Sequence, residues 1–151
     1  MADKLETGKK FVNNEQIGEP QLRIFVVEDD KGIMDFIKMI HEEDFSSVSF
    51  WTEFHETGDS LVERLGEIKD DGIPTILSTD CNLRGTIQGN ELIGICRQKF
   101  PDHFYAVMVS TRASDGFAIK AGADDYLTKP FDLDTYIGAI NQAINIVSPK
   151  K

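Results

Sequence analysis

Four short β-prone runs of this chain each end on a polar group, and this pattern restricts its fold more than any other feature. The polar groups are Glu28-Asp29-Asp30, Asp80, Ser110-Thr111 and Thr128-Lys129-Pro130. In an open parallel sheet the carboxyl ends of the strands meet at one edge, where ligands bind and chemistry takes place. The pattern therefore predicts a single site that contains an acidic cluster, a hydroxyl and a lysine.

Segments with helical periodicity separate these runs. The expected helices are one that Asp30 caps and that carries Ile33, Phe36, Ile37 and Ile40 on one face, one that begins at Ser60, one from about Asn90 to Phe100, a short one from Ser114 to Ala121, and a last one that Asp132 caps and that reaches Val147. A further strand is expected over Ser47–Thr52. Alternating strands and helices predict an α/β fold with a doubly wound, five-stranded parallel sheet, (βα)5, because each parallel connection needs a right-handed crossover helix.

The length of 151 residues suits one compact domain and is short for two of ordinary size. Residues 1–21 are polar and lack a sustained apolar period, so we expect a flexible N-terminal extension. The domain should then span residues 22–148, and residues 149–151 should form a frayed tail.

The formal net charge of −10 argues against nucleic acid and anionic membranes as partners, because both attract clustered Lys and Arg. A protein partner or a metal ion suits this charge better. The two cysteines, Cys81 and Cys96, lack the C-x-x-C spacing of zinc and redox sites, so we interpret both as reduced thiols. Since no apolar run resembles a signal sequence or approaches the roughly 20 residues of a membrane span, we expect a cytoplasmic protein.

The strand ends would bring the carboxylates of Glu28, Asp29 and Asp80 together, and these repel one another unless protons or a cation compensate. Hard oxygen ligands of this kind suit Mg²⁺. Considered alone, Asp80 could instead be a helix N-cap and Lys129 an ordinary surface lysine. As one site, a carboxylate nucleophile, a metal ion, Lys129 and the Ser110 hydroxyl describe phosphoryl transfer to an aspartate.

Four segments occur in an order and spacing typical of the receiver domain of bacterial two-component response regulators, and the chain resembles that family from about Gln21 to Val147. They are Val26–Asp30, the strand that ends at Asp80, Val109-Ser110 and Ala121–Phe131. The resemblance implies a flavodoxin-like sheet with strand order 2-1-3-4-5. It also implies a chemotaxis-regulator-like protein that accepts a phosphoryl group from a histidine kinase or a phosphotransfer protein, a signalling phosphoacceptor rather than an enzyme.

The resemblance assigns a role to each matching residue. It makes Asp80 the phosphoacceptor, Glu28 and Asp29 the acidic metal pair, Asn82 the donor of a backbone carbonyl to Mg²⁺, Ser110 the switch hydroxyl, Tyr126 the switch aromatic and Lys129 the phosphate-contacting lysine.

The chain also departs from the family pattern. The loop from Asp80 to Gly89 is one residue longer than usual, and Arg84 stands where the family commonly has proline. The segment Ser110–Gly122 is about three residues short, which trims the fourth helix, and Thr111 replaces a smaller residue. We therefore expect a downstream protein partner to contact the fifth strand and fifth helix more than the fourth helix.

Because 151 residues leave no room for an output domain, the sequence predicts a stand-alone receiver that signals to a separate protein. One alternative is a pseudo-receiver that serves as an interaction module without taking phosphate, which the trimmed fourth helix favours. The other is a flavodoxin-like redox protein, although Glu28-Asp29-Asp30 would repel a flavin phosphate at the end of the first strand.

Overall fold

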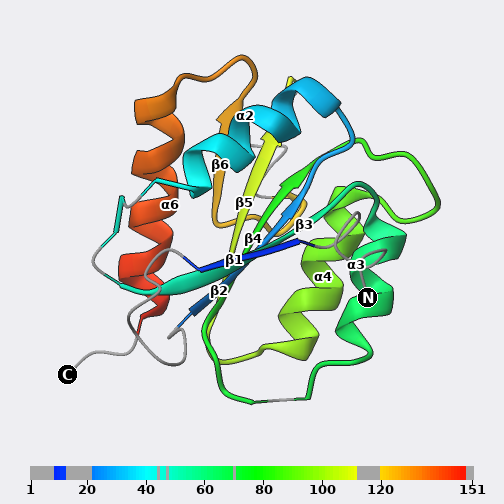
Figure 1. The fold of residues 1–151 in the computed structure, drawn as a ribbon. Coiled ribbons are helices and arrows are strands. Elements are labelled where there is room, and N and C mark those ends of the chain that lie inside the picture. Colours follow the sequence, from blue (N-terminus) through cyan, green and yellow to red (C-terminus); the bar gives the residue numbers. More distant parts are fainter. Residues whose placement is uncertain are drawn as a thin grey trace.

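The computed structural model describes residues 9–12, 22–43, 45–46, 48–69, 71–111 and 120–148, and for residues 9–12 the backbone alone. Within these ranges the chain forms one twisted sheet with helices on both of its faces (Figure 1). None of the helices that the structure describes combines the length and the hydrophobicity that a membrane span requires.

The sheet has six strands in the order β1-β3-β2-β4-β5-β6. Their bounds are β1 Lys9–Val12, β2 Leu22–Val27, β3 Phe50–His55, β4 Thr75–Asp80, β5 Phe104–Ser110 and β6 Asp125–Thr128. The five strands from β2 to β6 are parallel, and β4 lies between β2 and β5. Counted among themselves, these five have the order 2-1-3-4-5, which confirms the predicted doubly wound topology.

The first strand, β1, lies within the segment that we expected to be a flexible extension. It pairs antiparallel with the outer edge of β3, from Lys9 opposite Phe54 to Val12 opposite Trp51. The expectation is therefore wrong for residues 9–12, and the other residues of 1–21 lie outside the described part of the chain. The edge of β3 would otherwise present unpaired backbone groups, and β1 pairs with them.

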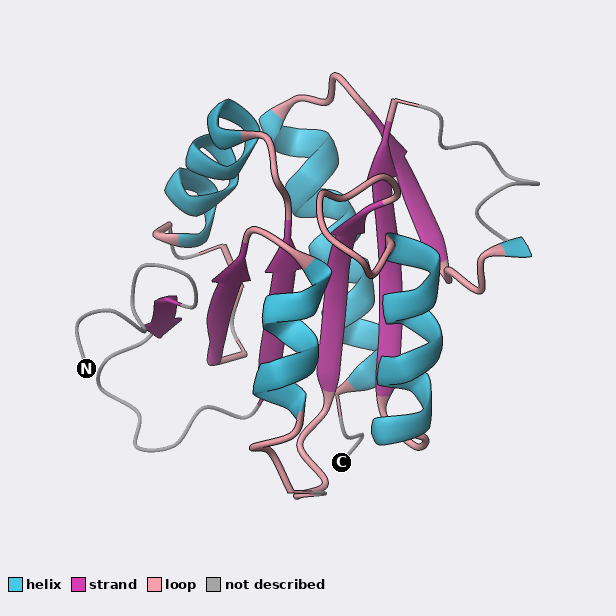
Figure 2. Cartoon of the chain, turned by 90° about the vertical axis from the view of Figure 1, so that its right-hand side faces the viewer, coloured by secondary structure: helices cyan, strands magenta, loops and turns pink. Residues whose placement is uncertain are grey.

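Helices cover the two faces of the sheet in pairs (Figure 2). Their bounds are α2 Lys31–His41, α3 Gly58–Leu65, α4 Gly89–Lys99 and α6 Leu133–Val147. Apolar side chains of α2 and α6 belong to one core cluster, and those of α3 and α4 to the other. The thiol of Cys96 is fully buried in the second cluster, where burial raises its pKa to about 12, so Cys96 is a core residue.

Two element boundaries differ from the prediction. The second parallel strand, β3, begins at Phe50, three residues later than Ser47. The helix after it starts at Gly58, because Thr57 is the N-cap and its hydroxyl accepts a hydrogen bond from the Ser60 N–H at 3.1 Å. Ser60 therefore lies inside the helix, and its own hydroxyl is 2.7 Å from Nδ1 of His55.

The ends of α2 and α6 confirm two predicted caps. Asp30 accepts a hydrogen bond from the Ile33 N–H at 2.9 Å, and Asp132 accepts one from the Thr135 N–H at 2.8 Å. Leu133, the first residue of α6, is 43% exposed, and the buried side chains of the helix begin at Tyr136. The short helix predicted over Ser114–Ala121 lies outside the described residues except for its last two positions, and its trimming stays a prediction.

A buried hydrogen-bond network connects α2, β3 and α6. The His41 ring lies 2.9 Å from the Thr52 hydroxyl through Nδ1 and 2.7 Å from the Tyr136 hydroxyl through Nε2. Burial lowers the pKa of His41 to about 3, so this ring is neutral at physiological pH. The network fixes the α2 and α6 layer against the sheet without adding charge to the core.

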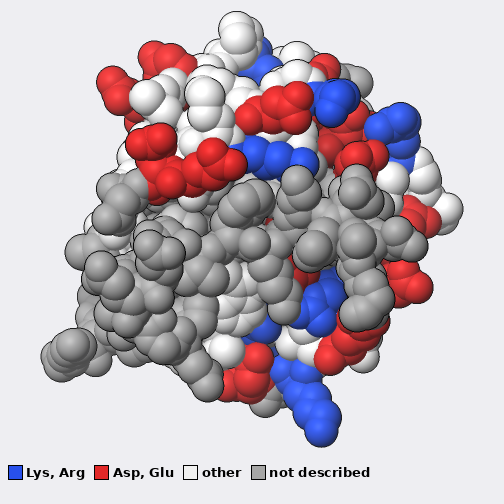
Figure 3. Space-filling model, in the orientation of Figure 1, with Lys and Arg blue, Asp and Glu red and all other residues white. Residues whose placement is uncertain are grey.

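On the face in Figure 3, acidic and basic side chains are interspersed around α2.

Candidate functional site

The position of Asp80 follows from the central place of β4 in the sheet. All six residues of β4 are buried, and Asp80 is the last of them, with 8% of its surface exposed. On one side Thr79 pairs with Val27 of β2, and on the other Asp80 pairs with Val109 of β5. The chain therefore delivers one carboxylate to the C-terminal edge of the sheet.

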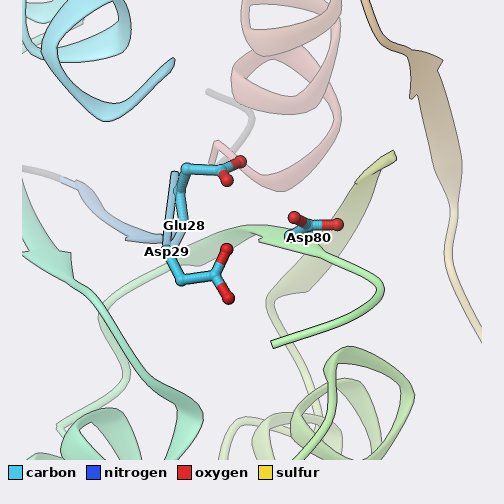
Figure 4. A group of neighbouring side chains, drawn as sticks. All are labelled: Glu28, Asp29 and Asp80. Carbon is cyan, nitrogen blue, oxygen red and sulfur yellow. The ribbon is translucent and has the colours of Figure 1, made fainter. Parts of the chain in front are cut away.

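The end of β2 brings two more carboxylates to the same place. One ligand oxygen each from Glu28, Asp29 and Asp80 lies within 4.8 Å of the others. Figure 4 shows the three side chains facing a common space from the ends of β2 and β4. The sequence prediction that these three residues converge is thus met by their geometry.

Lys129, which follows β6, supplies the nearest positive charge. Its Nζ lies 2.9 Å from Oδ2 of Asp80 and 2.9 Å from Oε1 of Glu28. Burial opposes the ammonium form, but the hydrogen bonds to Asp80 and Glu28 outweigh it and hold the pKa of Lys129 above its ordinary value. The Lys129 N–H also donates to the Ser110 carbonyl at 3.1 Å, so the ends of β5 and β6 are joined beside the carboxylates, and the Lys129-Pro130 peptide bond is cis.

The charge on Glu28 shows how the cluster is balanced. Burial raises the pKa of Glu28 to about 6, although hydrogen bonds from Lys129 and from the Asp30 N–H act in the opposite direction, and the Asp80 charge raises it further. A single ammonium shared between two carboxylates does not fully stabilise the ionised form of Glu28. The negative charge of the cluster is therefore not fully balanced, and the cluster can bind another cation.

This donor set fits Mg²⁺. Three clustered carboxylate oxygens are the hard ligands that the ion prefers, and Mg²⁺ uses few protein ligands while keeping water or phosphate oxygens for the rest. Glu28, Asp29 and Asp80 would hold the ion. The exposed Asn82 donates its N–H to Oδ1 of Asp80 at 3.3 Å, which places its backbone beside the cluster, and the predicted role of its carbonyl as a ligand stays a prediction.

The loop from Cys81 to Gln88 borders the cluster, and a residue that the sequence did not indicate holds it in place. Oδ1 of Asp59, in the first turn of α3, accepts hydrogen bonds from the Thr86 N–H at 3.0 Å and the Ile87 N–H at 3.1 Å. The Gln88 side chain accepts from the Leu83 N–H at 2.9 Å and donates to the Leu83 carbonyl at 3.0 Å. The loop is therefore held by hydrogen bonds from α3 and from Gln88. No local signal could have found Asp59, because its partners lie 27 and 28 residues further along the chain.

Gly89 closes the loop onto β4. A Cβ at this position would lie 2.1 Å from the Asp80 carbonyl oxygen, a distance that no side chain tolerates. Glycine therefore allows α4 to begin directly against the strand end that carries Asp80.

Arg84 contacts the cluster from its outer side. Its N–H donates to Oδ2 of Asp29 at 2.9 Å, its Nη2 donates to the Asp29 carbonyl at 3.2 Å, and its Nε lies 3.8 Å from Oδ2. The sequence singled out Arg84 as a departure from the family pattern, but its contact with Asp29 becomes visible only in the fold.

The two predicted switch residues lie on neighbouring strands. Ser110 ends β5 and is 1% exposed, whereas Tyr126 of β6 pairs with Met108 and is half-buried against the α3 and α4 core cluster. Thr111 follows Ser110 and is exposed. The structure thus places Ser110 beside the ends of β4 and β6, while the roles of both residues as a switch stay predictions.

Comparisons with known proteins agree with this geometry. The model of the response regulator receiver domain family matches residues 24–141 of the chain. The non-phosphorylated HemR receiver domain from Leptospira biflexa is 22% identical, with a TM-score of 0.67 over 86% of this chain and 99% of that chain. The receiver domain of the Francisella response regulator 1452 is 26% identical, with a TM-score of 0.65 over 85% of this chain and 98% of that chain.

A response regulator receiver domain protein from Clostridium thermocellum is 21% identical, with a TM-score of 0.66 over 83% of this chain and 95% of that chain. No match was found among curated proteins. The family model spans most of the chain and includes the strand ends that carry Glu28, Asp29, Asp80 and Lys129. This chain belongs to the response regulator receiver domain family.

Proposed function

We propose that this receiver domain accepts a phosphoryl group on Asp80 from a histidine kinase or a phosphotransfer protein, in a Mg²⁺-dependent reaction in the cytoplasm. The observation that carries the proposal is the position of Asp80, whose carboxylate lies between Lys129 and the acidic pair at the edge of the sheet. No other carboxylate of the described residues ends a central strand in this way.

The Asp80 carboxylate is positioned to act as the nucleophile. Asn82 donates to its Oδ1 and Lys129 to its Oδ2, so the group is oriented before a donor arrives. One carboxylate oxygen forms a bond to phosphorus while the phosphorus–nitrogen bond of the donor phosphohistidine breaks, and the imidazole leaves. Bound Mg²⁺ would supply positive charge against the phosphoryl oxygens.

The side chains around Asp80 would then respond to the new group. A phosphoryl group adds negative charge and strong acceptor oxygens, so Lys129 exchanges its contact with Asp80 for one with a phosphoryl oxygen. The Ser110 hydroxyl is the next donor at the strand ends. Its movement would open space for the Tyr126 ring to turn inward, which changes the surface formed by β6 and α6. We place the contact with a downstream protein on that surface, where Leu133 and Ile146 are exposed apolar residues.

Treatment with acetyl phosphate, with and without Mg²⁺, followed by intact-mass measurement tests phosphorylation directly. We expect one added phosphoryl group in the presence of Mg²⁺ and none in the Asp80→Asn variant. Asp35→Asn is the matched control, since it removes a surface carboxylate of α2 that pairs with Lys31 at 3.8 Å. An undiminished mass shift in Asp80→Asn would assign the modification to another residue, and no shift in the wild type would favour the interaction-module alternative.

Beryllofluoride, which stands in for the phosphoryl group, tests the switch separately. Amide chemical shifts of the treated and untreated protein should differ at Ser110, Thr111 and Tyr126 as well as next to Asp80. Shifts confined to the neighbours of Asp80 would show that phosphorylation does not reach β6 and α6.

A further inference from the structure

Each carboxylate of the acidic cluster already has a cation of the protein beside it. Lys129 lies 2.9 Å from both Glu28 and Asp80 on the inner side. The guanidinium of Arg84 lies against Asp29 on the outer side, with Nε 3.8 Å from Oδ2 and Nη2 3.2 Å from the Asp29 carbonyl. The Arg84 side chain is 67% exposed, so it can leave this position without opening the core.

The backbone keeps Arg84 close to Asp29 even if the guanidinium moves. The Arg84 N–H donates to Oδ2 of Asp29 at 2.9 Å, and Asp59 holds the following residues through the N–H groups of Thr86 and Ile87. The side chain therefore starts from a fixed point beside the cluster. Since a guanidinium does not lose its proton in proteins, its positive charge is permanent there.

A divalent ion held by Asp29 would share that carboxylate with Arg84. The ion and the guanidinium carry charges of the same sign, and their separation would be a few ångströms at a partly exposed site. Repulsion between them raises the free energy of the metal-bound state. The repulsion is largest at low ionic strength, because salt screens charges at the surface.

We propose that Arg84 is a built-in competitor of Mg²⁺, a residue whose positive charge beside Asp29 lowers the affinity of the site for the ion. The inference rests on the proposed function in one respect only, namely that Mg²⁺ binds to Glu28, Asp29 and Asp80. Arg84 does not touch the phosphoacceptor in this arrangement, so it acts through Asp29 as a positioning residue. It sets how much Mg²⁺ the receiver needs before Asp80 can react.

Mg²⁺ titration followed by amide chemical shifts tests this proposal without any phosphodonor. In Arg84→Gln we expect the dissociation constant for Mg²⁺ to fall by about two- to fivefold at low salt, the range expected when an exposed charge contact is removed. The difference from the wild type should shrink at about 0.5 M NaCl, where the Debye length is only a few ångströms. Arg84→Lys keeps the charge and should remain close to the wild type.

Lys31→Gln is the matched control. It removes the same charge near the same end of the sheet, but Lys31 is 91% exposed and pairs with Asp35 instead of Asp29. An equal gain of affinity in Lys31→Gln and Arg84→Gln would reduce the effect to net charge and overturn the proposal.

Four further outcomes would also overturn it. Unchanged affinity in Arg84→Gln would show that the guanidinium does not compete with the ion. Weaker binding, or a change that does not depend on salt, would show that Arg84 only shapes the loop. If neither the wild type nor Arg84→Gln responds to Mg²⁺, the metal site of the proposed function is wrong as well, whereas a wild-type response that Arg84→Gln leaves unaltered removes the competitor alone.

Discussion

Two glutamates of this protein, Glu28 and Glu53, are buried to the same degree, but their pKa values are shifted in opposite directions. The side chains of Glu28 and Glu53 are each 2% exposed. Burial raises the pKa of Glu28 to about 6. Burial also favours the neutral form of Glu53, but contacts with His55 and Arg64 outweigh it and lower the pKa of Glu53 to about 2.

The difference lies in how each cation contacts its glutamate and in whether its second carboxylate is buried. Arg64 donates to Glu53 in a forked arrangement, through Nε at 2.9 and 3.0 Å and through Nη2 at 2.9 Å. Lys129, in contrast, is shared between Glu28 and Asp80, with Asp29 close by. Arg64 also reaches Glu67 at 3.3 Å, but that carboxylate is 52% exposed. The forked contact with Glu53 therefore fastens α3 to β3, whereas the buried acidic cluster has too little positive charge and can bind another cation. This contrast separates a structural ion pair from a site that can act on a ligand.

The largest effect on stability is expected when the ion pair of Arg64 and Glu53 is broken. Arg64→Ala leaves Glu53 buried without its main partner, and removing one member of a buried pair is strongly destabilising. We expect the free energy of unfolding in urea to fall by about 2 kcal/mol or more. Arg97→Ala is the control, because its partner Asp124 is 34% exposed and the pair lies at the surface. Equal effects of the two substitutions would remove the distinction between Glu53 and an ordinary surface carboxylate.

The next largest effect is a dependence of the free energy of unfolding on pH that arises from Glu53. Because the pKa of Glu53 is lower in the folded protein than its ordinary value of 4.5, this group stabilises the fold fully above about pH 4.5, and the stabilisation is lost as the pH falls toward 2. Between about pH 4.5 and pH 3 the loss should be about 2 kcal/mol. Urea unfolding of the wild type and of Glu53→Gln across this interval measures it, and parallel pH profiles would contradict the assigned pKa.

The sequence predicts the acidic cluster well because the physics of parallel sheets brings it together. Glu28, Asp80 and Lys129 each stand at the end of a β-prone run, and the carboxyl ends of such runs share one edge. The doubly wound parallel sheet is confirmed for a similar reason, since alternating strands and helices favour parallel connections, whereas the strand order 2-1-3-4-5 is implied by the family resemblance. Periodicity and strand ends are local signals, and they suffice for this site.

Other features depend on contacts that no local pattern contains. The pair of Arg64 and Glu53 joins residues 11 positions apart on a helix and a strand, and Asp59 holds a loop more than 25 residues away. Both Thr57 and Ser60 are good N-cap residues, so the sequence alone could not choose between them. Only the backbone pairing of β1 with the edge of β3 shows that Lys9–Val12 join the sheet.

Mg²⁺ should increase the difference between Glu28 and Glu53, because only Glu28 lies in the cluster that would bind the ion. A ligand that binds only the folded state stabilises it by about 1.4 kcal/mol at ten times its dissociation constant. We expect this gain in the wild type and in Arg64→Ala alike, since the Glu53 pair lies outside the metal cluster. The free energy of unfolding is measured in MgCl₂ and in NaCl of the same ionic strength with a chelator. An equal gain in both salts would reduce the effect to screening.

The smallest expected effect is a gain of stability, whereas breaking the pair of Arg64 and Glu53 causes a loss. For that reason it is the most direct test of the comparison between Glu28 and Glu53. Asp29→Asn removes one of three crowded negative charges. It keeps a side-chain oxygen that can accept the hydrogen bond from the Arg84 N–H, so few stabilising contacts are lost. In chelator, the variant should be more stable than the wild type by about 0.5–1 kcal/mol, and Mg²⁺ should no longer stabilise it. Asp35→Asn, on the exposed side of α2, should change neither quantity. A loss of stability in Asp29→Asn would mean that Lys129 and Arg84 already balance the cluster, in which case Glu28 and Glu53 would differ in degree and not in kind.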